Sequence, residues 1–496
     1  MEALLRRFGP LAAAVVSIAV VWFVWGRDAI PKVQDESSYL LQAEIFARGR
    51  WTAPAPAIPE FFEQPHVQVV PRVASKYPPG HALLLAAGVL AGFPPLVPLV
   101  LTGVTAALLV ALTMRVANPW VALLAWALWS TAPIVLRYQP GYFSEVTTAA
   151  LVLVGWWALH TWRQERRRRW LILLALAVGW GAITRPLTML AFALPIGFIV
   201  LRDAHRRRLW GHVALALVTG AAVLSLLPLW SARTTGDWRL SPVEKYRRDY
   251  LPFDRIGFTP DTSPPRRAIA PPLQHVSDYF RRARAQQTLS ALPATAGERL
   301  WNVGLGFFGG IRLPLLLAFV AGLVVMRGPV RFAAISAAFV FLAYLPYAHW
   351  APWTVYYLEL APALAAVSAV GLCAIVDRVT GVARAGQAVA VATVAVLAAG
   401  VPEVVKWRRD HRAQSALDRQ FLDDLQKLPR PAIVFVRYSA RVAAHVGVVR
   451  NHADLESAPV WVVHDMGPRN EALRRLAPGR RSFDFEEDQL MRQRPR

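Results

Sequence analysis

The chain has 496 residues, of which 55% are hydrophobic and 18% are charged, and its formal net charge is +23. This is more apolar surface than a water-soluble core of this length can bury, and segments such as 101–114 are apolar on every side. These features exclude a soluble globular protein and predict a helical protein with many membrane spans. Cys373, the one cysteine, excludes an internal disulfide and a cysteine-based metal site.

The positive charge is concentrated in arginine clusters at the ends of apolar segments. This distribution is typical of a membrane protein, so the net charge does not indicate binding to nucleic acid. Examples are Arg6 with Arg7, and the clusters at 163–169 and 202–208. Because short cytoplasmic loops retain Lys and Arg, one topology places all of these clusters, and the N-terminus, on the cytoplasmic side. No small-residue cleavage site follows the apolar residues 11–25, so we expect a retained first span.

A membrane span needs roughly 20 apolar residues, and about eleven segments of the chain qualify. They are about 8–26, 96–115, 119–138, 145–162, 170–185, 187–201, 210–230, 303–326, 331–348, 354–376 and 384–404. Residues 80–93 are apolar but short and end at two prolines, and we interpret them as an interfacial or re-entrant helix. The predicted fold is an all-α polytopic membrane protein with its transmembrane domain at 1–404.

Three regions are predicted to lie outside the cytoplasm: outer loops at about 27–79 and 231–302, and the tail. Within the tail, 418–428 has the pattern of an amphipathic helix, and 432–438 and 460–465 have the pattern of buried strands. We therefore predict a small soluble α/β extracytoplasmic domain at 405–496.

Acidic residues near the membrane surface are the first candidates for chemistry. Asp35 and Glu36 follow the first span, and in a helix Asp35 shares a face with Tyr39. A partly desolvated carboxylate in this position can act as a general base toward a hydroxyl. The alternative is that Asp35 caps the N-terminus of a surface helix.

Residues 35–65 resemble the first outer loop of GT-C glycosyltransferases, namely the protein O-mannosyltransferases and the lipid A aminoarabinose transferases. Their pattern is an Asp-Glu pair, a tyrosine three residues on, a Gly-x-Trp turn and an aromatic-Glu-Lys-Pro element. Here these elements are Asp35 with Glu36, Tyr39, 49–51 and 62–65, with Gln64 in the place of the lysine. The segment 76–88 is similar to the one with which many bacterial members leave this loop.

The resemblance implies an inverting glycosyltransferase in the inner (plasma) membrane of a bacterium, with a sugar on a polyprenyl phosphate as donor. Asp35 would be the catalytic base that accepts the proton of an acceptor hydroxyl, beside Glu36. Glu145, at the outer start of the fourth span, would be a second catalytic acid residue. The alternative is that Glu145 is an acid in the first turn of a helix, where it interacts favourably with the helix dipole, and that Ser144 is the N-cap residue. The sequence does not distinguish between a lipid, a protein and a polysaccharide as the acceptor, and it does not identify the sugar.

Negative charge develops on the lipid phosphate as it leaves, and nearby cationic side chains are needed to stabilise it. Lys76, Arg137 and Arg185 are the candidates for binding this phosphate, and Arg185 precedes a proline between two predicted spans. The alternative for Arg185 is an interfacial anchor whose charged end reaches water. Further residues expected to line the cavity are Tyr39, Glu63, Tyr77, His81, Tyr356 and Tyr357.

No histidine is paired with another His or Cys at ligand spacing, so no metal or other cofactor is expected. A transporter or flippase of lipid-linked sugars is the alternative from another class, since acids and arginines at the membrane also suit transport. The lack of an internal repeat, and acids at the outer edge instead of the bilayer midplane, favour the enzyme. A third possibility is a degenerate family member that acts only in assembly.

Overall fold

The computed structural model describes residues 2–27, 29–259, 263–380, 385–438 and 447–486. The chain forms two compact units, which are described separately below. Unit 1 comprises Met1–Gly26, Pro98–Ser225 and Ser290–Arg409, and unit 2 comprises Arg27–Val97, Leu226–Leu289 and Asp410–Arg496.

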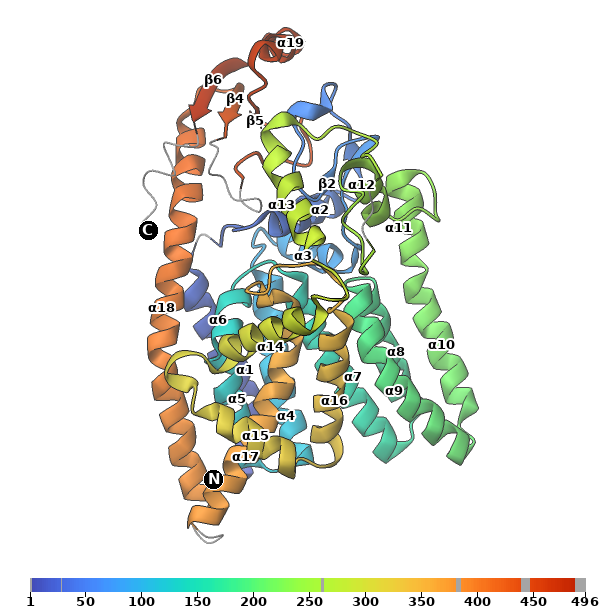
Figure 1. Ribbon diagram of the computed structural model, residues 1–496, viewed down its shortest axis with the longest axis vertical. Helices are drawn as coiled ribbons and strands as arrows, with labels where there is room; N and C mark the ends of the chain where they lie inside the picture. Colours follow the sequence, from blue (N-terminus) through green and yellow to red (C-terminus); the bar gives the residue numbers. More distant parts are fainter. Residues whose placement is uncertain (1, 28, 260–262, 381–384, 439–446, 487–496) are drawn as a thin grey trace. The chain divides into compact units, whose positions relative to one another are not determined.

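Unit 1 is built of helices. They are α1 (Glu2–Trp25), most of α4 (Leu96–Val116), α5 (Pro119–Ser130), α6 (Pro133–Tyr138), α7 (Ser144–Glu165), α8 (Arg168–Ala182), α9 (Pro186–Arg207), α10 (Trp210–Leu224), α14 (Leu292–Phe308), α15 (Leu315–Val325), α16 (Gly328–Ala343), α17 (Ala361–Thr380) and the first part of α18 (Ala385–Lys427), with the 3-10 helices η3 (Gly310–Arg312) and η4 (Thr354–Leu360). Helices α7, α8, α9 and α10 pack side by side (Figure 1).

Within the described residues, six helices are long and apolar enough to span a membrane, or seven if the bent pair α15–α16 counts as one span. Each range predicted as a span coincides with one or more helices, while the total of about eleven stays a prediction. The prediction of a single helix over 303–326 is wrong. Here α14 ends at Phe308, η3 follows, and Gly310 adopts a φ of +66°, which glycine tolerates without steric cost.

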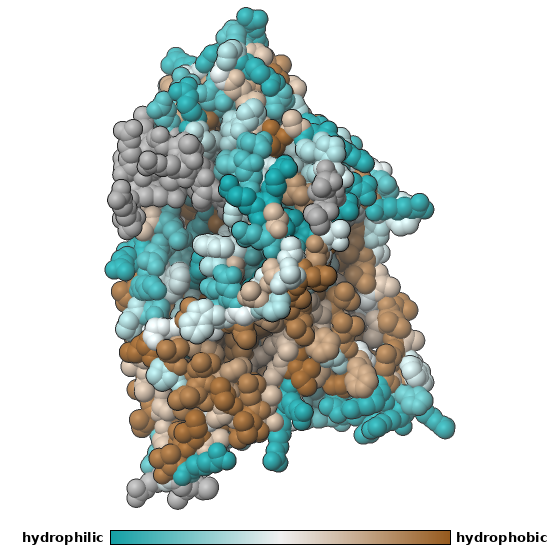
Figure 2. Space-filling model, viewed as in Figure 1, coloured by the Kyte–Doolittle hydropathy of each residue, from teal (hydrophilic) through white to brown (hydrophobic). Residues whose placement is uncertain are grey.

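Exposed hydrophobic side chains cover the outside of unit 1. Figure 2 shows them over the helical bundle, and examples are Leu217 on α10 and Leu317 and Val324 on α15. Water-soluble proteins rarely expose continuous apolar surface of this extent, whereas a lipid bilayer covers it. The surface therefore agrees with a membrane protein.

Unit 2 combines short helices with two small sheets. Its elements are α2 (Gln34–Ala47), β1 (Ala53–Pro54), η1 (Pro59–Phe61), β2 (Val67–Gln68), β3 (Arg72–Ser75), α3 (Gly80–Leu90), α11 (Leu226–Thr235), α12 (Pro242–Tyr250), η2 (Pro271–Leu273), α13 (Gln274–Ala285), the end of α18, β4 (Ala432–Arg437), β5 (Val460–His464), η6 (Gly467–Arg469), α19 (Asn470–Leu476) and β6 (Arg481–Glu486).

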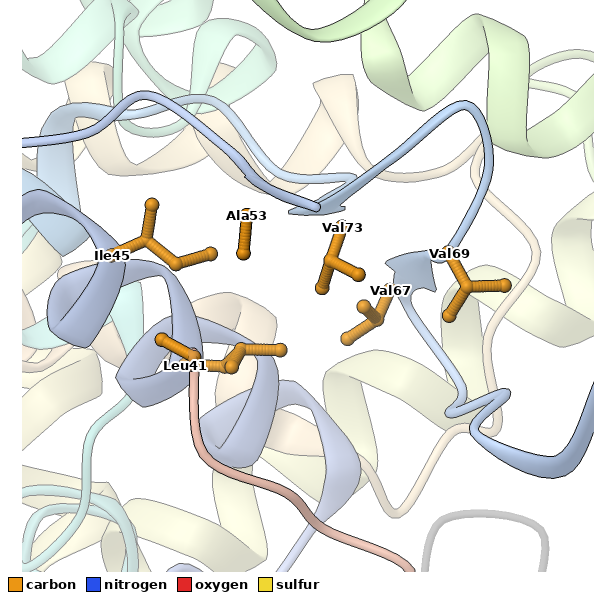
Figure 3. Packing of buried hydrophobic residues seen from close by; sticks show 7 residues of the cluster. Leu41, Ile45, Ala53, Val67, Val69 and Val73 are labelled. Atoms are coloured by element: carbon orange, nitrogen blue, oxygen red, sulfur yellow. The ribbon is translucent and has the colours of Figure 1, made fainter. Parts of the chain in front are cut away.

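The first sheet has the order β1-β3-β2, with antiparallel pairing, and it packs against α2. Leu41 and Ile45, four residues apart on one face of α2, contact Val67 and Val73 of the sheet (Figure 3). This apolar core fixes the first turn of α2 relative to the end of β3, where Lys76 and Tyr77 follow.

The second sheet is parallel, in the order β5-β4-β6. The predicted strands at 432–438 and 460–465 are confirmed as β4 and β5, whereas β6 was missed because its sequence, RSFDFE, alternates charged and apolar residues and its side chains are mostly exposed. The helix predicted at 418–428 is the end of α18, which runs for 43 residues. The predicted boundary at residue 404 therefore lies inside one continuous helix.

Candidate active site

The Asp35 cluster comprises Asp35, His66, Lys76, Tyr77 and Tyr246, all in unit 2. Asp35 lies in the first turn of α2, and the N-cap position itself is occupied by Val33. The Tyr77 hydroxyl donates a hydrogen bond to Asp35 Oδ1, and His66 Nε2 lies 3.5 Å from Asp35 Oδ2. The Asp35 side chain as a whole is 19% exposed, whereas its Oδ2 atom is buried.

Buried aromatic rings hold Tyr77 in place. The Tyr39 ring stacks on the Tyr77 ring at a centroid distance of 4.7 Å, and the His81 ring meets Tyr39 edge-on at 4.9 Å. Tyr39 lies one helical turn after Asp35, as the i,i+4 spacing predicts. Three of the residues expected to line the cavity, Tyr39, Tyr77 and His81, are therefore brought together beside Asp35.

His66 is held in a backbone conformation that non-glycine residues rarely adopt, with a φ of +69°. Its amide donates to the Tyr246 hydroxyl at 3.1 Å, and its carbonyl accepts from Ser38 Oγ and from the Lys76 amide, each at 2.9 Å. Such strain persists only where surrounding contacts over-determine it. The three hydrogen bonds, from α12, α2 and the end of β3, provide that constraint.

Lys76 is a buried residue, 8% exposed, and its ammonium lies near two aromatic rings. Its Nζ lies 5.1 Å from the Tyr77 ring centroid and 5.2 Å from that of Tyr246, within the range of cation–π attraction. Burial lowers the pKa of Lys76, while the negative charges of Asp254 and Asp35 oppose this shift. Among the residues that the structure describes, no carboxylate lies within ion-pair distance of this ammonium.

The other two acids predicted in this unit have structural contacts. Glu36 is fully buried and accepts a hydrogen bond from the Lys32 amide at 3.1 Å. Glu63 accepts from the Tyr250 hydroxyl at 3.2 Å and from the Ala270 amide at 2.8 Å, and burial raises the pKa of its carboxyl. Glu63 therefore links the segment after α2 to the segment around 250–270.

The Arg185 cluster comprises Glu145, Arg185, Tyr344 and Glu359, all in unit 1. Arg185 Nη1 donates to Glu145 Oε1, Arg185 Nε lies 3.1 Å from Glu359 Oε1, and Arg185 Nη2 donates to the Tyr344 hydroxyl at 2.6 Å. The side chains of Arg185, Glu145 and Glu359 are 11%, 5% and 1% exposed. Arg185 is therefore paired inside the bundle and is not an anchor whose charged end reaches water.

Hydroxyl groups complete the pairing in this cluster. Ser144 begins α7 but does not cap it, because the N-cap position is Phe143; its hydroxyl donates to Glu145 Oε2 at 3.2 Å. Thr148 donates to Glu359 Oε1 at 2.6 Å. Two carboxylates share one guanidinium, so the charged groups of the cluster sum to −1 when both acids are ionised.

The remaining predicted residues of unit 1 have other contacts. Tyr356 places its ring 5.7 Å from Arg185 Cζ, and the Tyr357 hydroxyl lies 3.1 Å from His349 Nε2. Arg137 instead packs over the rings of Tyr138 and Trp407, at 5.0 and 5.7 Å. Within the described part of the chain, Arg137 is not brought into the Arg185 cluster.

Sequence reasoning missed Tyr344, Thr148, Tyr246 and Asp254. Tyr344 is at the end of a predicted span, where tyrosines usually form an interfacial belt, and Tyr246 lies among arginines of a long loop. No local pattern connects either residue to its partner. Over the described ranges, no three His, Cys, Asp or Glu side chains gather in a geometry that could hold a metal ion.

Comparison with known proteins adds two findings. Residues 78–231 match the family described as Dolichyl-phosphate-mannose-protein mannosyltransferase. The chain is also similar to the crystal structure of ArnT from Cupriavidus metallidurans bound to undecaprenyl phosphate, with a TM-score of 0.54 and 18% identity over 96% of this chain and 90% of that chain. The apo ArnT structure gives a TM-score of 0.50 and 17% identity, over 96% and 89%. No curated protein sequence matches the chain.

The family match covers the segment from Pro78 into α11, and the similarity to the ArnT fold extends over nearly the whole chain. Both agree with the resemblance seen at residues 35–65 and favour the enzyme over the transporter. The prediction of a membrane glycosyltransferase of the GT-C class is confirmed at this level, by the family match over residues 78–231 and by the similarity of the fold to ArnT.

Proposed function

We propose that this enzyme transfers a sugar from a polyprenyl phosphate to an acceptor hydroxyl on the extracytoplasmic side of the membrane, with inversion at the anomeric carbon. One observation carries the proposal. The Asp35 carboxylate is oriented by Tyr77 and His66, and the Lys76 ammonium is buried beside it. A base and a cation in one small site match the two needs of this reaction.

The chemistry is a single displacement. The acceptor oxygen attacks the anomeric carbon while the bond from that carbon to the phosphate oxygen breaks, and its electron pair leaves with the phosphate. Asp35 takes the proton of the acceptor hydroxyl during the attack. Because Tyr77 donates to one carboxylate oxygen and His66 faces the other, the carboxylate is already oriented when the acceptor arrives.

Lys76 is proposed to stabilise the charge that grows on the departing phosphate. A cation fixed in a buried site acts on developing charge without reorganising at the moment of reaction. Lys76 also supplies an ammonium in a chain that has Gln64 instead of the lysine of the resembling sequence pattern. The bound undecaprenyl phosphate of the ArnT structure supports a lipid phosphate as the ligand class.

Arg185 receives a different role from the one expected from the sequence. Its donors already contact Glu145, Glu359 and Tyr344, so a phosphate would have to replace one of these partners. We propose that Arg185 is a positioning residue that connects α7, α9, α16 and η4. Glu145 is then proposed to orient Arg185, and Arg137 to pack against aromatic rings.

The activity test uses purified protein and synthetic polyprenyl-phosphate sugars. We expect release of polyprenyl phosphate and an inverted anomeric configuration in the product, with no transfer from nucleotide sugars. Activity should survive treatment with EDTA, since the proposal assigns the positive charge to Lys76. Retained configuration, or transfer from a nucleotide sugar, would contradict the proposal. Mass spectrometry of envelope lipids and glycoproteins from a deletion strain would identify the sugar and its acceptor.

The proposed location is the inner membrane of a bacterium, with both outer loops and the tail outside the cytoplasm. It is tested with single cysteines at Glu60, Asp237 and Asp454 in a Cys373→Ala background. A membrane-impermeant maleimide should label all three in intact spheroplasts. Labelling only after the cytoplasmic face is opened would overturn this orientation.

A further inference from the structure

A cavity of about 300 Å³ lies inside unit 1 and shares no lining residue with the Arg185 cluster. Helices α4, α7, α9, α16 and α17 line it, and it is open on part of its surface. Its wall is mainly apolar, with Leu153, Trp156 and Ala333 among the lining residues. A volume of this size falls at the lower end of the range found for ligand pockets.

The cavity is elongated and has one polar end. Its lining follows α7 from Leu153 to Arg163, ten residues that span about 15 Å at the rise of an α-helix. His160, Arg163 and Arg202 gather at one end, and Leu153 and Ala366 mark the apolar end. The shape and polarity match an amphipathic molecule with a hydrocarbon chain and an anionic head.

The polar end carries excess positive charge. Asp203 accepts from Arg163 Nε at 3.0 Å and from Arg202 Nη2 at 3.0 Å, and Arg166 Nη1 lies 3.5 Å away. One carboxylate cannot neutralise three guanidinium groups, so two positive charges remain. The Arg163 and Arg202 side chains are 42% and 38% exposed, which leaves their ends accessible to an anion.

We propose that this cavity binds one acyl chain of an anionic phospholipid, with the lipid phosphate at Arg163 and Arg202. Burial of a hydrocarbon chain in the apolar part is favourable in proportion to the area covered. Arginine is suited to bind the lipid head group because its planar guanidinium can donate two hydrogen bonds to the oxygens of a phosphate. The cytoplasmic leaflet, where the arginine clusters are predicted to lie, is rich in anionic lipid.

The first experiment is native mass spectrometry of the purified full-length protein with phosphatidylglycerol or phosphatidylcholine of matched chains. We expect one retained phosphatidylglycerol. At about 1 kcal/mol for each basic residue near an anionic lipid, each Arg→Gln change should weaken its binding about fivefold. Arg163→Gln and Arg202→Gln test this, Arg202→Lys should keep most of the preference, and Arg207→Gln, an exposed position outside the cavity, is the control.

The second experiment fills the cavity. Ala333→Phe should reduce the bound phosphatidylglycerol at least tenfold, while Leu201→Phe, on the exposed surface of α9, should not. Ala366→Phe is the second filling variant if thermal unfolding shows that Ala333→Phe is misfolded. Equal binding of both phospholipids, or unchanged binding in a folded filling variant, would overturn the proposal. Displacement by equimolar undecaprenyl phosphate would assign the cavity to the donor lipid and would overturn it too.

Discussion

The Asp35 and Arg185 clusters both bring carboxylate and cationic side chains together, one carboxylate in the first and two in the second, but they pair the charges differently. In the Arg185 cluster, the guanidinium contacts two carboxylates directly, and its Nη2 donates a hydrogen bond to the Tyr344 hydroxyl. In the Asp35 cluster, the carboxylate contacts a tyrosine hydroxyl and a histidine ring, while the Lys76 ammonium faces two aromatic rings.

This difference separates a structural link from a reactive site. A buried ion pair holds its members to each other, and breaking it costs about 3–5 kcal/mol, so its charge serves orientation and stability. A cation–π contact is worth only about 0.5–2 kcal/mol and leaves the cation able to meet an anion. We therefore expect changes at Asp35 and Lys76 to affect turnover, and changes at Arg185 to affect folding first.

The largest effect on turnover is expected for Asp35→Asn. The amide keeps the shape of the side chain and an oxygen for the Tyr77 hydroxyl, but it cannot take a proton, and loss of a general base costs about 10²–10⁴ in rate. Turnover with a synthetic lipid-linked sugar measures this change. Glu44→Gln, a half-exposed acid on the same helix, is the matched control and should retain activity. Wild-type turnover in folded Asp35→Asn would remove the catalytic assignment.

Lys76→Met should lower turnover by about 10²–10³, the loss typical of a removed electrostatic stabiliser. Burial lowers the pKa of Lys76 below that of a solvated lysine. The positive charge of Lys76, and with it the activity, should therefore be lost as the pH rises through this lowered pKa. Lys76→Arg keeps its charge to higher pH, and its alkaline limb should move upward. Identical alkaline limbs in the wild type and Lys76→Arg would exclude the titration of Lys76 as their cause.

Arg185→Ala should destabilise the protein by about 3–5 kcal/mol, because it leaves Glu145 and Glu359 buried without their guanidinium. Arg185→Lys should cost less, since it retains the charge. Thermal unfolding in detergent measures both. Adding Glu359→Gln to Arg185→Ala should recover part of the loss by removing one buried charge. Lowered turnover with unchanged unfolding would instead favour phosphate binding by Arg185.

The smallest effect is expected for Tyr77→Phe, which removes the hydrogen bond to Asp35 and keeps the ring between Lys76 and Tyr39. A hydrogen bond to a charged group is worth about 1.5–3 kcal/mol, so kcat should fall about tenfold or more, with little change in KM. Tyr77→Leu, which also loses the ring, should cost more. Equal kcat in the wild type and Tyr77→Phe would show that Tyr77 does not position the base.

The sequence predicted the membrane class, the helical segments and two of the tail strands because these depend on local composition. A run of apolar residues long enough to cross the bilayer, or a short buried strand, is visible within about 20 residues. The break between α14 and α15 was not visible, because the glycines there look like ordinary small residues of an apolar run. Strand β6 was missed because its half-exposed pattern resembles a polar loop.

For the candidate site, the sequence by itself determined which groups were available: an acid pair after the first span, a lysine after β3, and an arginine before α9. Tertiary structure decided their partners. His66 meets Tyr246 across 180 residues, and Arg185 meets Glu359 across 174. Helix and strand periodicities describe only near neighbours, whereas packing of distant segments selects these pairs. That selection separates Lys76, which faces aromatic rings, from Arg185, which is already neutralised.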